Sequence, residues 1–240
     1  MVIEACVNSA ISAIEAQKGG AARVELCENL HDGGTTPSAG AILFARKNLL
    51  IGLFVMIRPR GGDFLYSDDE FEIMKEDIKV ARELGADGVV FGILKPDGTI
   101  DLERMKTLVD LSRPMGITCH RAFDMTVDPF QAMEDLITLG IDRILTSGQQ
   151  KTAPEGTALI AQLIRLSKGR IIIMPGSGVK EDNVAELIRT TGAMEVHVHL
   201  EKQQPSRMIF KQPGVYMGKP DQTEFEHTVT DWERIQKVRK

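Results

Sequence analysis

Short runs of apolar and β-branched residues recur along this 240-residue chain, and a stretch with helical periodicity follows each of them. Alternation of this kind is typical of βα units. The eight predicted strands are residues 2–6, 23–27, 53–58, 88–92, 117–121, 143–147, 170–175 and 195–200. Eight such units in one chain favour a closed (β/α)8 TIM barrel, with an open doubly wound sheet as the alternative.

Two of the intervening segments carry clear helix start signals. Ser67 is followed three residues later by Glu70, which is the spacing of a capping box, and an apolar stripe then runs on to Gly85. Asp128 precedes Pro129 and a second apolar stripe, so another helix is predicted to begin there. We expect both helices to pack their apolar stripes against the sheet.

The end of the chain breaks the alternation. Residues 203–223 are polar and include Pro205, Pro213 and Pro220, and only 231–240 has a helical pattern. We predict that 201–240 contains an irregular loop packed on the surface and then the eighth helix, with an oligomer contact as the alternative role of the loop. Residues 1–240 are predicted to form a single domain, since 240 residues with 42% apolar content can bury one large core and this length is ordinary for an α/β barrel.

Polar residues inside the predicted strands share one face. Side chains alternate along a strand, so Glu4 and Cys6 point the same way, and Glu25 and Cys27 do too. The same alternation selects polar residues in other strands, namely Arg58, Thr118, His120, Glu195, His197 and His199. The outer face of a barrel packs on helices and is apolar, so we assign this polar set to the lumen.

Charges in a lumen need partners, because an unpaired buried charge is strongly destabilising. We expect Glu4, Glu25 and Glu195 to pair with Arg58, Arg143 and the imidazoles. Such pairs are either purely structural or part of a functional site. The polar residues gather toward the carboxyl ends of the strands, where barrel enzymes have their active sites, and this favours a functional site.

Two loops that follow predicted strands are candidates for binding and catalysis. Arg58 and Arg60 flank a proline and are predicted to clamp a carboxylate or phosphate. His120 follows the fifth strand and is a candidate general acid or base, with Asp124 orienting its ring and Glu25 as the partner carboxylate.

A glycine-rich turn follows the seventh predicted strand. Gly176, Ser177 and Gly178 precede a helical pattern, and backbone amides at a helix start bind anions. Barrels often place phosphate beside strands seven and eight. The turn is therefore a candidate anion site, although glycines also serve tight strand-to-helix turns.

Two cysteines are predicted to lie at matching ends of neighbouring strands. Parallel strands run about 4.8 Å apart, so the sulfurs of Cys6 and Cys27 can approach one soft ion, and two thiolates suit Cu(I). Zinc would need further ligands, which His197 or His199 can supply. Cys119 has the parity of the helix-facing side and is assigned a packing role.

Composition and net charge disfavour some classes of binding partner. The net charge of −5 and pI near 5.6 disfavour nucleic acid and anionic membranes. Three cysteines in a chain of this size do not suggest disulfides, and the chain begins with a strand pattern in place of a signal peptide, so we expect a cytoplasmic protein. A metal ion or a small anionic metabolite remains as the partner.

Several motifs in order along the chain resemble the CutC family, the copper homeostasis proteins. They are ELC at 25–27, GGTTPS at 33–38, VMIRPRGGDFLYSDDEF at 55–71, GADGVVFGIL at 85–94, HRAFD at 120–124, DRILTSGQ at 142–149 and IMPGSGV at 173–179. The resemblance implies a (β/α)8 barrel, a cytoplasmic location, a homodimer or homotetramer, and Cu(I) handling through Cys6 and Cys27. The alternative function is a metal-independent enzyme of lyase or isomerase type acting on a small phosphorylated or carboxylated metabolite.

Overall fold

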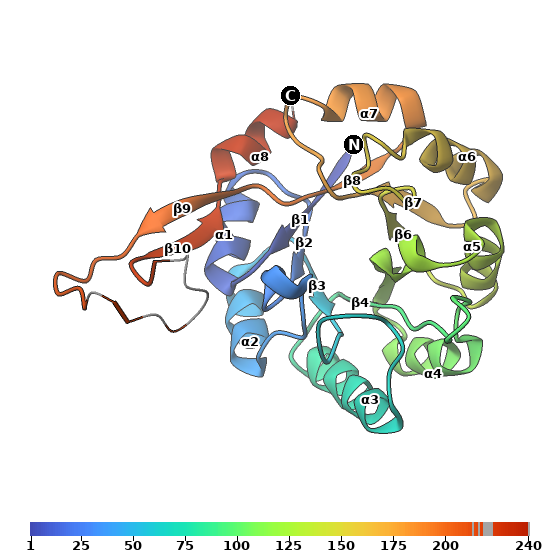
Figure 1. Cartoon of the computed structure of the whole chain (residues 1–240), viewed down its shortest axis with the longest axis horizontal. Helices are drawn as coiled ribbons and strands as arrows, with labels where there is room; N and C mark the ends of the chain where they lie inside the picture. The colour runs from blue at the N-terminus through green and yellow to red at the C-terminus, as the bar shows by residue number, and fades with distance from the viewer. Residues whose placement is uncertain (213, 216, 218–222, 240) are drawn as a thin grey trace.

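Eight parallel strands form a nearly closed barrel in the computed structural model, with helices around the outside (Figure 1). The structure describes residues 1–240 except 213, 216, 218–222 and 240. Hydrogen-bonded ladders link the strands in the order β7-β6-β5-β4-β3-β2-β1-β8, and β7 and β8 lie side by side at the seam. The arrangement confirms the predicted (β/α)8 barrel and shows that the open-sheet alternative is wrong.

Each strand begins within two residues of its predicted start. Most strands end one or two residues earlier than predicted. The barrel strands are β1 (Val2–Val7), β2 (Arg23–Leu26), β3 (Gly52–Met56), β4 (Gly88–Phe91), β5 (Gly116–Cys119), β6 (Arg143–Thr146), β7 (Ile172–Pro175) and β8 (Glu195–Val198). The residues that follow each strand therefore belong to loops at the mouth of the barrel, where their side chains no longer obey strand alternation.

Helices alternate with the strands and surround the barrel. They are α1 (Ala10–Lys18), α2 (Ala39–Asn48), α3 (Asp68–Glu83), α4 (Leu102–Ser112), α5 (Pro129–Thr138), α6 (Thr157–Ser167), α7 (Val184–Thr191) and α8 (Trp232–Val238), with short 3-10 turns η1 (Leu30–Asp32) and η2 (Arg121–Met125). Both predicted start signals are confirmed. Ser67 and Glu70 form the reciprocal capping box of α3, and Asp128 caps α5. None of the helices in the described part of the chain has the length and apolarity needed to cross a membrane.

Side chains that alternate along the strands fall into two packed regions, as predicted: the core between barrel and helices, and the lumen. The odd-numbered residues of β1, Ile3, Ala5 and Val7, belong to the main hydrophobic core between barrel and helices. Cys6 lies on the other face, in a small lumen cluster with Cys27, Phe54, Met56 and Val90. Glu4 is also fully buried on that inner face.

Phe54 fills the amino-terminal end of the lumen. Its ring lies against Gly88 and Gly116, and a Cβ atom at Gly88 would fall only 2.3 Å from the ring. Any larger residue at position 88 would therefore displace the phenyl group. The guanidinium groups of Arg23 and Arg143 lie 5.0 and 5.6 Å from the centre of the same ring, within range for cation–π attraction. This layer closes the lumen below the site.

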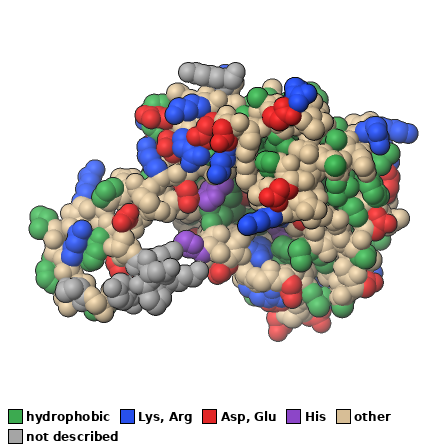
Figure 2. Space-filling model, turned by 45° about the horizontal axis from the view of Figure 1, so that its top comes forward, with side chains coloured by type: hydrophobic (Ala, Val, Ile, Leu, Met, Phe, Trp, Pro, Cys, Tyr) green, Lys and Arg blue, Asp and Glu red, His purple; other side chains and the backbone are tan. Residues whose placement is uncertain are grey.

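The predicted packed surface loop is wrong. Strands β9 (Glu201–Pro205) and β10 (Glu226–Thr230) pair antiparallel and project from the barrel as an arm, which here means the described residues of 201–230 (Figure 1). The two strands pair with each other, and the carboxyl end of β10 is anchored on the barrel, where Asn8 donates to the Thr228 carbonyl and the Thr230 amide donates to Ser12. Hydrophobic side chains gather at the outer end of the arm (Figure 2), where Ile209 is entirely exposed. Pro213 and Pro220 lie outside the described residues.

Candidate functional site

The lower half of the lumen is a closed network of ion pairs. Arg23 lies between two carboxylates: its Nε donates to Glu4, and one of its terminal nitrogens lies 2.7 Å from Glu195. Arg143 Nε donates to the same Glu195 at 2.6 Å. Burial raises the pKa of Glu195, but the hydrogen bonds from Arg143 and Arg23 outweigh it and leave that pKa lowered.

Arg23 is the principal residue that the sequence interpretation missed. It has the same parity as Glu25 and Cys27, so strand alternation alone places it in the lumen. The expected partners of the carboxylates were partly wrong, because Arg58 contacts none of them while Arg23 joins two. Arg143 pairs with Glu195 as expected.

His197 links this ion-pair layer to the layer above it. Its Nδ1 lies 2.8 Å from Glu4, and its Nε2 lies 3.7 Å from Glu25. Burial lowers the pKa of His197, but hydrogen bonding to Cys6 and the charge of Glu25 outweigh that and hold it well above its ordinary value. Burial raises the pKa of Glu4 too, yet the hydrogen bond from His197 and the charge of Arg23 bring it to about 2. An imidazolium therefore stands between the two glutamates.

Three potential metal ligands meet above His197. One ligand atom each of Cys6, Glu25 and Cys27 lie within 4.8 Å of one another, and all three residues are buried. The strand register explains the approach, because Cys6 stands beside Glu25 across the ladder between β1 and β2. The Cys27 thiol donates to the Glu25 carboxyl at 3.5 Å.

The two thiols differ in acidity. The hydrogen bond from Cys27 lowers the pKa of Cys6, and the charge and hydrogen bond of His197 lower it further, so that it lies well below the usual value despite burial. The same contact with Cys6, together with burial, raises the pKa of Cys27. Cys6 is therefore the more acidic of the two thiols and Cys27 the less acidic.

A cavity of about 210 Å³ opens from this cluster toward the mouth of the barrel. Its lining residues are Cys6, Glu25, Gly33, Met56, Arg58, Phe64, His120, Arg121, Leu145 and His197. The structure thus brings four predicted site residues of the mouth, Glu25, Arg58, His120 and His197, to one cavity with Cys6. Cys27 contributes to the metal-ligand cluster behind it.

Arg58 is a cavity residue, but Arg60 is not. Arg58 is only 4% exposed, whereas Arg60 turns outward and pairs with Glu70 at 2.6 Å and Asp63 at 3.1 Å. The predicted clamp of two arginines is therefore wrong. β3 ends at Met56, so the chain direction changes at Pro59 and the two side chains diverge.

Asp124 does not orient His120, contrary to the prediction. Its carboxylate accepts hydrogen bonds from Arg121, Thr146 and Ser147, and it fixes the loop after β6. The ring of His120 is held differently, because His120 caps η2 and its Nδ1 accepts the amide hydrogen of Ala122. Burial, with the nearby charge of Arg58, lowers the pKa of His120 to about 3. His120 is thus a neutral ring at physiological pH.

The glycine-rich turn lies elsewhere and does not run directly into a helix. Gly178 is separated from α7 by residues 179–183, and the Gly176 amide donates to the Thr146 carbonyl. A Cβ at Gly176 would meet Leu145 and His197, so this glycine is needed for close packing. None of Gly176, Ser177 and Gly178 lines the mouth cavity.

Two further predicted residues lie outside the site. His199 follows the end of β8, is partly exposed and lies 2.9 Å from Glu201. It is not among the clustered metal-ligand residues. Cys119 belongs to the helix-facing core, as predicted, and burial raises its pKa to about 12. It is an inert packing residue.

Comparison with known proteins agrees with the geometry. The model of the CutC family matches residues 1–202. The copper homeostasis protein cutC homolog of Mus musculus is 49% identical over 98% of this chain and 86% of its own, and the human homolog is 48% identical over the same shares. A family protein CutC of Chromobacterium violaceum is 47% identical over 99% of this chain and 96% of its own.

Comparison with solved structures also identifies CutC proteins as similar to this chain. The crystal structure of CutC from Streptococcus agalactiae superposes with a TM-score of 0.79 at 37% identity, covering 82% of this chain and 97% of that one. Phosphoribosylanthranilate isomerase of Pyrococcus furiosus shares only the fold, with a TM-score of 0.56 at 14% identity over 100% of this chain and 97% of that one. The sequence match over most of the chain and the shared barrel lead to one conclusion: this chain belongs to the CutC family.

Proposed function

We propose that the protein binds Cu(I) through Cys6 and Cys27 and acts in copper homeostasis in the cytoplasm. The observation that carries the proposal is the convergence of two buried sulfurs and the Glu25 carboxyl within 4.8 Å. Thiolates are soft ligands that select Cu(I) over harder ions. The homologs from mouse and human are named for copper homeostasis, and all three cysteines here are free, as a reducing compartment requires.

The acid–base state of the cluster suits such binding. Cys6 has the lower pKa of the two thiols, so it is the one that more readily becomes a thiolate ligand. The Cys27 thiol hydrogen-bonds the Glu25 carboxyl, but the raised pKa of that carboxyl makes it a poor acceptor for the thiol proton. The raised pKa of His197 favours a positive charge beside Cys6, which stabilises a thiolate there.

Copper titration under anaerobic conditions tests the proposal. We expect about one Cu(I) per chain in the wild type and loss of tight binding in Cys6→Ala and Cys27→Ala. Cys119→Ala is the matched control, because its sulfur lies in the outer core and should leave stoichiometry unchanged. Equal stoichiometry in a Cys6→Ala/Cys27→Ala double variant would rule the proposal out.

A second candidate function is a barrel enzyme acting on a small anion. It is favoured by the mouth cavity, where buried polar atoms of Arg58, His120 and Glu25 have no hydrogen-bond partner. Arg60 and Asp124 have no part in it. His120 would serve as a proton donor or acceptor and Glu25 as the second carboxyl. Incubation with small phosphorylated and carboxylated metabolites, followed by NMR, tests it: turnover lost in His120→Asn supports the role, and turnover equal to wild type contradicts it.

The chain is also proposed to assemble as a homodimer or homotetramer. The support is the arm, whose Met208, Ile209 and Phe210 are exposed by 60%, 100% and 71%. Exposed apolar side chains grouped in this way favour a protein contact. Light scattering of the purified protein checks the mass, and a monomer would contradict the assembly.

A further inference from the structure

Arg58 is a buried cation without a carboxylate partner. Its terminal nitrogens donate to the backbone carbonyls of Asp32, Gly34 and Gly62 at 2.7 to 2.8 Å. No carboxylate of the described residues forms an ion pair with it. A buried charge held only by neutral groups is uncommon, since its desolvation is not offset by an opposite charge.

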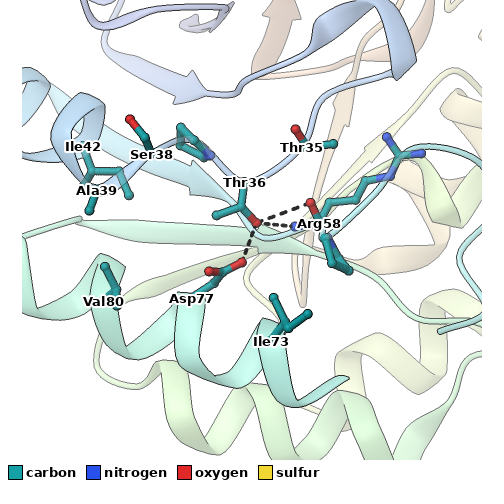
Figure 3. A pocket seen from close by; sticks show the side chains of 11 residues that line it. Thr35, Thr36, Ser38, Ala39, Ile42, Arg58, Ile73, Asp77 and Val80 are labelled. Carbon is teal, nitrogen blue, oxygen red and sulfur yellow. Dashed lines mark hydrogen bonds between the residues drawn. The ribbon is translucent and has the colours of Figure 1, made fainter. Parts of the chain in front are cut away.

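The neighbouring acid, Asp77, is directed elsewhere. Figure 3 shows Thr36 bridging Asp77 to the backbone of Arg58, while the guanidinium group points away from that carboxylate. The Thr36 hydroxyl donates to Asp77 at 2.7 Å and accepts from the Arg58 amide at 3.0 Å. The backbone of Arg58 is therefore fixed on one side and its charge is presented on the other, to the mouth cavity.

Two buried hydrogen-bond donors, on two residues that line this cavity, lack partners. Arg58 Nε is buried with no partner, and so is His120 Nε2. The ring of His120 accepts through Nδ1, so the proton of the neutral imidazole is on Nε2 and that atom is a donor. An unpartnered buried donor is destabilising by itself, and two in one cavity indicate a missing acceptor.

Phe64 brings the two donors together. The Arg58 guanidinium lies 5.1 Å from the centre of the Phe64 ring, and the His120 ring lies 4.9 Å from it. All three line the same cavity, with Cys6, Glu25 and His197 among its other lining residues. The wall thus combines one uncompensated positive charge, two N–H donors and an apolar ring.

We propose that this cavity binds a small monocarboxylate, whose two oxygens accept hydrogen bonds from Arg58 Nε and His120 Nε2. One negative charge neutralises Arg58, whereas a phosphate dianion would leave a buried excess of negative charge. The loop amides of Gly176 to Gly178, which would suit phosphate, lie outside the cavity. A cavity of about 210 Å³ has room for a small ligand, since about 10 to 15 Å³ of such volume already holds one water molecule.

The inference concerns binding alone, so it rests on neither copper binding nor turnover. Cys27 does not line the cavity, although it is a proposed copper ligand. Cys27→Ala is therefore expected to lose copper and to keep the carboxylate. This variant makes failure of one proposal distinguishable from failure of the other.

Calorimetric titration of the metal-free chain with acetate, propionate and pyruvate tests the site, with inorganic phosphate as the comparison anion. We expect saturable binding of at least one monocarboxylate at one per chain. Arg58→Gln should weaken it by roughly 10- to 100-fold, the equivalent of one charge-assisted hydrogen bond. Arg60→Gln is the matched control, because that arginine pairs outside the cavity, and it should bind like the wild type.

His120→Asn keeps the measurement decisive if Arg58→Gln does not fold. Asparagine retains an acceptor for the Ala122 amide but removes the Nε2 donor, so it should also weaken carboxylate binding. The proposal is overturned if none of the three carboxylates binds, if phosphate binds in their place, or if both cavity variants bind as tightly as the wild type.

Discussion

The two layers of the lumen use the same residue types in opposite ways. In the lower layer, Arg23 and Arg143 face Glu4 and Glu195, and every charge meets an opposite charge. In the upper layer, Arg58 meets only backbone carbonyls, and Glu25 and His120 each carry a buried atom with no partner. The lower layer is complete without a ligand, and the upper layer is not.

The contrast separates structural charge from functional charge. Saturated ion pairs close the barrel beneath the site and hold His197 in place through Glu4. The unsaturated groups belong to residues that line the mouth cavity together with Cys6, the more acidic of the two clustered thiols. Buried polarity alone is therefore weak evidence for function, and buried polarity without partners is stronger evidence.

The largest effect is expected in the lower layer. Glu195→Gln removes the negative charge shared by Arg23 and Arg143 and leaves two buried cations with one carboxylate. Breaking a buried pair in this way lowers the free energy of unfolding by about 3 kcal/mol. Urea denaturation at pH 7 measures the loss. A loss within experimental error of zero would mean that this layer is not what holds the lumen closed.

A smaller effect, with a defined pH window, is expected from His120. Its folded-state pKa is lowered to about 3, while the unfolded chain takes up the proton near pH 6.5. The unfolded state therefore binds more protons in this interval, and stability falls as the pH falls below 6.5. Between pH 6.5 and 5 the loss is about 2 kcal/mol. His120→Asn removes this titration, so the stability of the variant relative to the wild type should rise by about that amount as the pH falls from 6.5 to 5.

Glu25 titrates in the same window in the opposite sense, because its raised folded-state pKa makes stability rise as the pH falls. It does so in the wild type and the variant alike, so the His120 contribution is the difference between the two curves. Glu4, with a folded pKa of about 2, makes a contribution that is lost only as the pH falls below its unfolded value near 4.5. His197 has a raised pKa, so it is protonated in both states below about pH 6.5 and its contribution is constant there. Chemical denaturation at several pH values gives the comparison. A stability difference between His120→Asn and the wild type that stays constant from pH 6.5 to 5 would contradict the prediction.

The lumen could be predicted from the sequence as far as the strands extend. Alternation correctly placed Glu4, Cys6, Glu25 and Cys27 inside, because each lies within or directly after a strand of fixed parity. Arg23 obeys the same rule and could have been found. Its partner Glu195 is 172 residues away, and the contact exists only because β8 closes the barrel beside β1.

Prediction failed where strands end. Arg60, Asp124 and His199 all follow the last residue of a strand, and their directions are set by loops and short turns that alternation does not describe. Asp124 lies in η2, where neighbouring loop groups of Thr146 and Ser147 capture its carboxylate. The arm was missed for a related reason, since β9 is exposed throughout and polar except for Pro205, and β10 is polar except for Val229, so neither strand carries an apolar pattern.

The smallest change in stability is expected from Glu25→Gln. This variant allows a direct comparison of the upper layer with the lower layer, which Glu195→Gln tests. Burial, with the charge of Cys6, raises the pKa of Glu25 well above its ordinary value, so the folded state binds a proton that the unfolded state releases above pH 4.5. Stability contributed by this residue therefore falls as the pH rises. Glutamine mimics the protonated acid, so the variant should be as stable as the wild type at pH 7 or more stable by about 1 kcal/mol. Urea denaturation under the conditions used for Glu195→Gln measures it, and a loss as large as in that variant would show that both layers are structural.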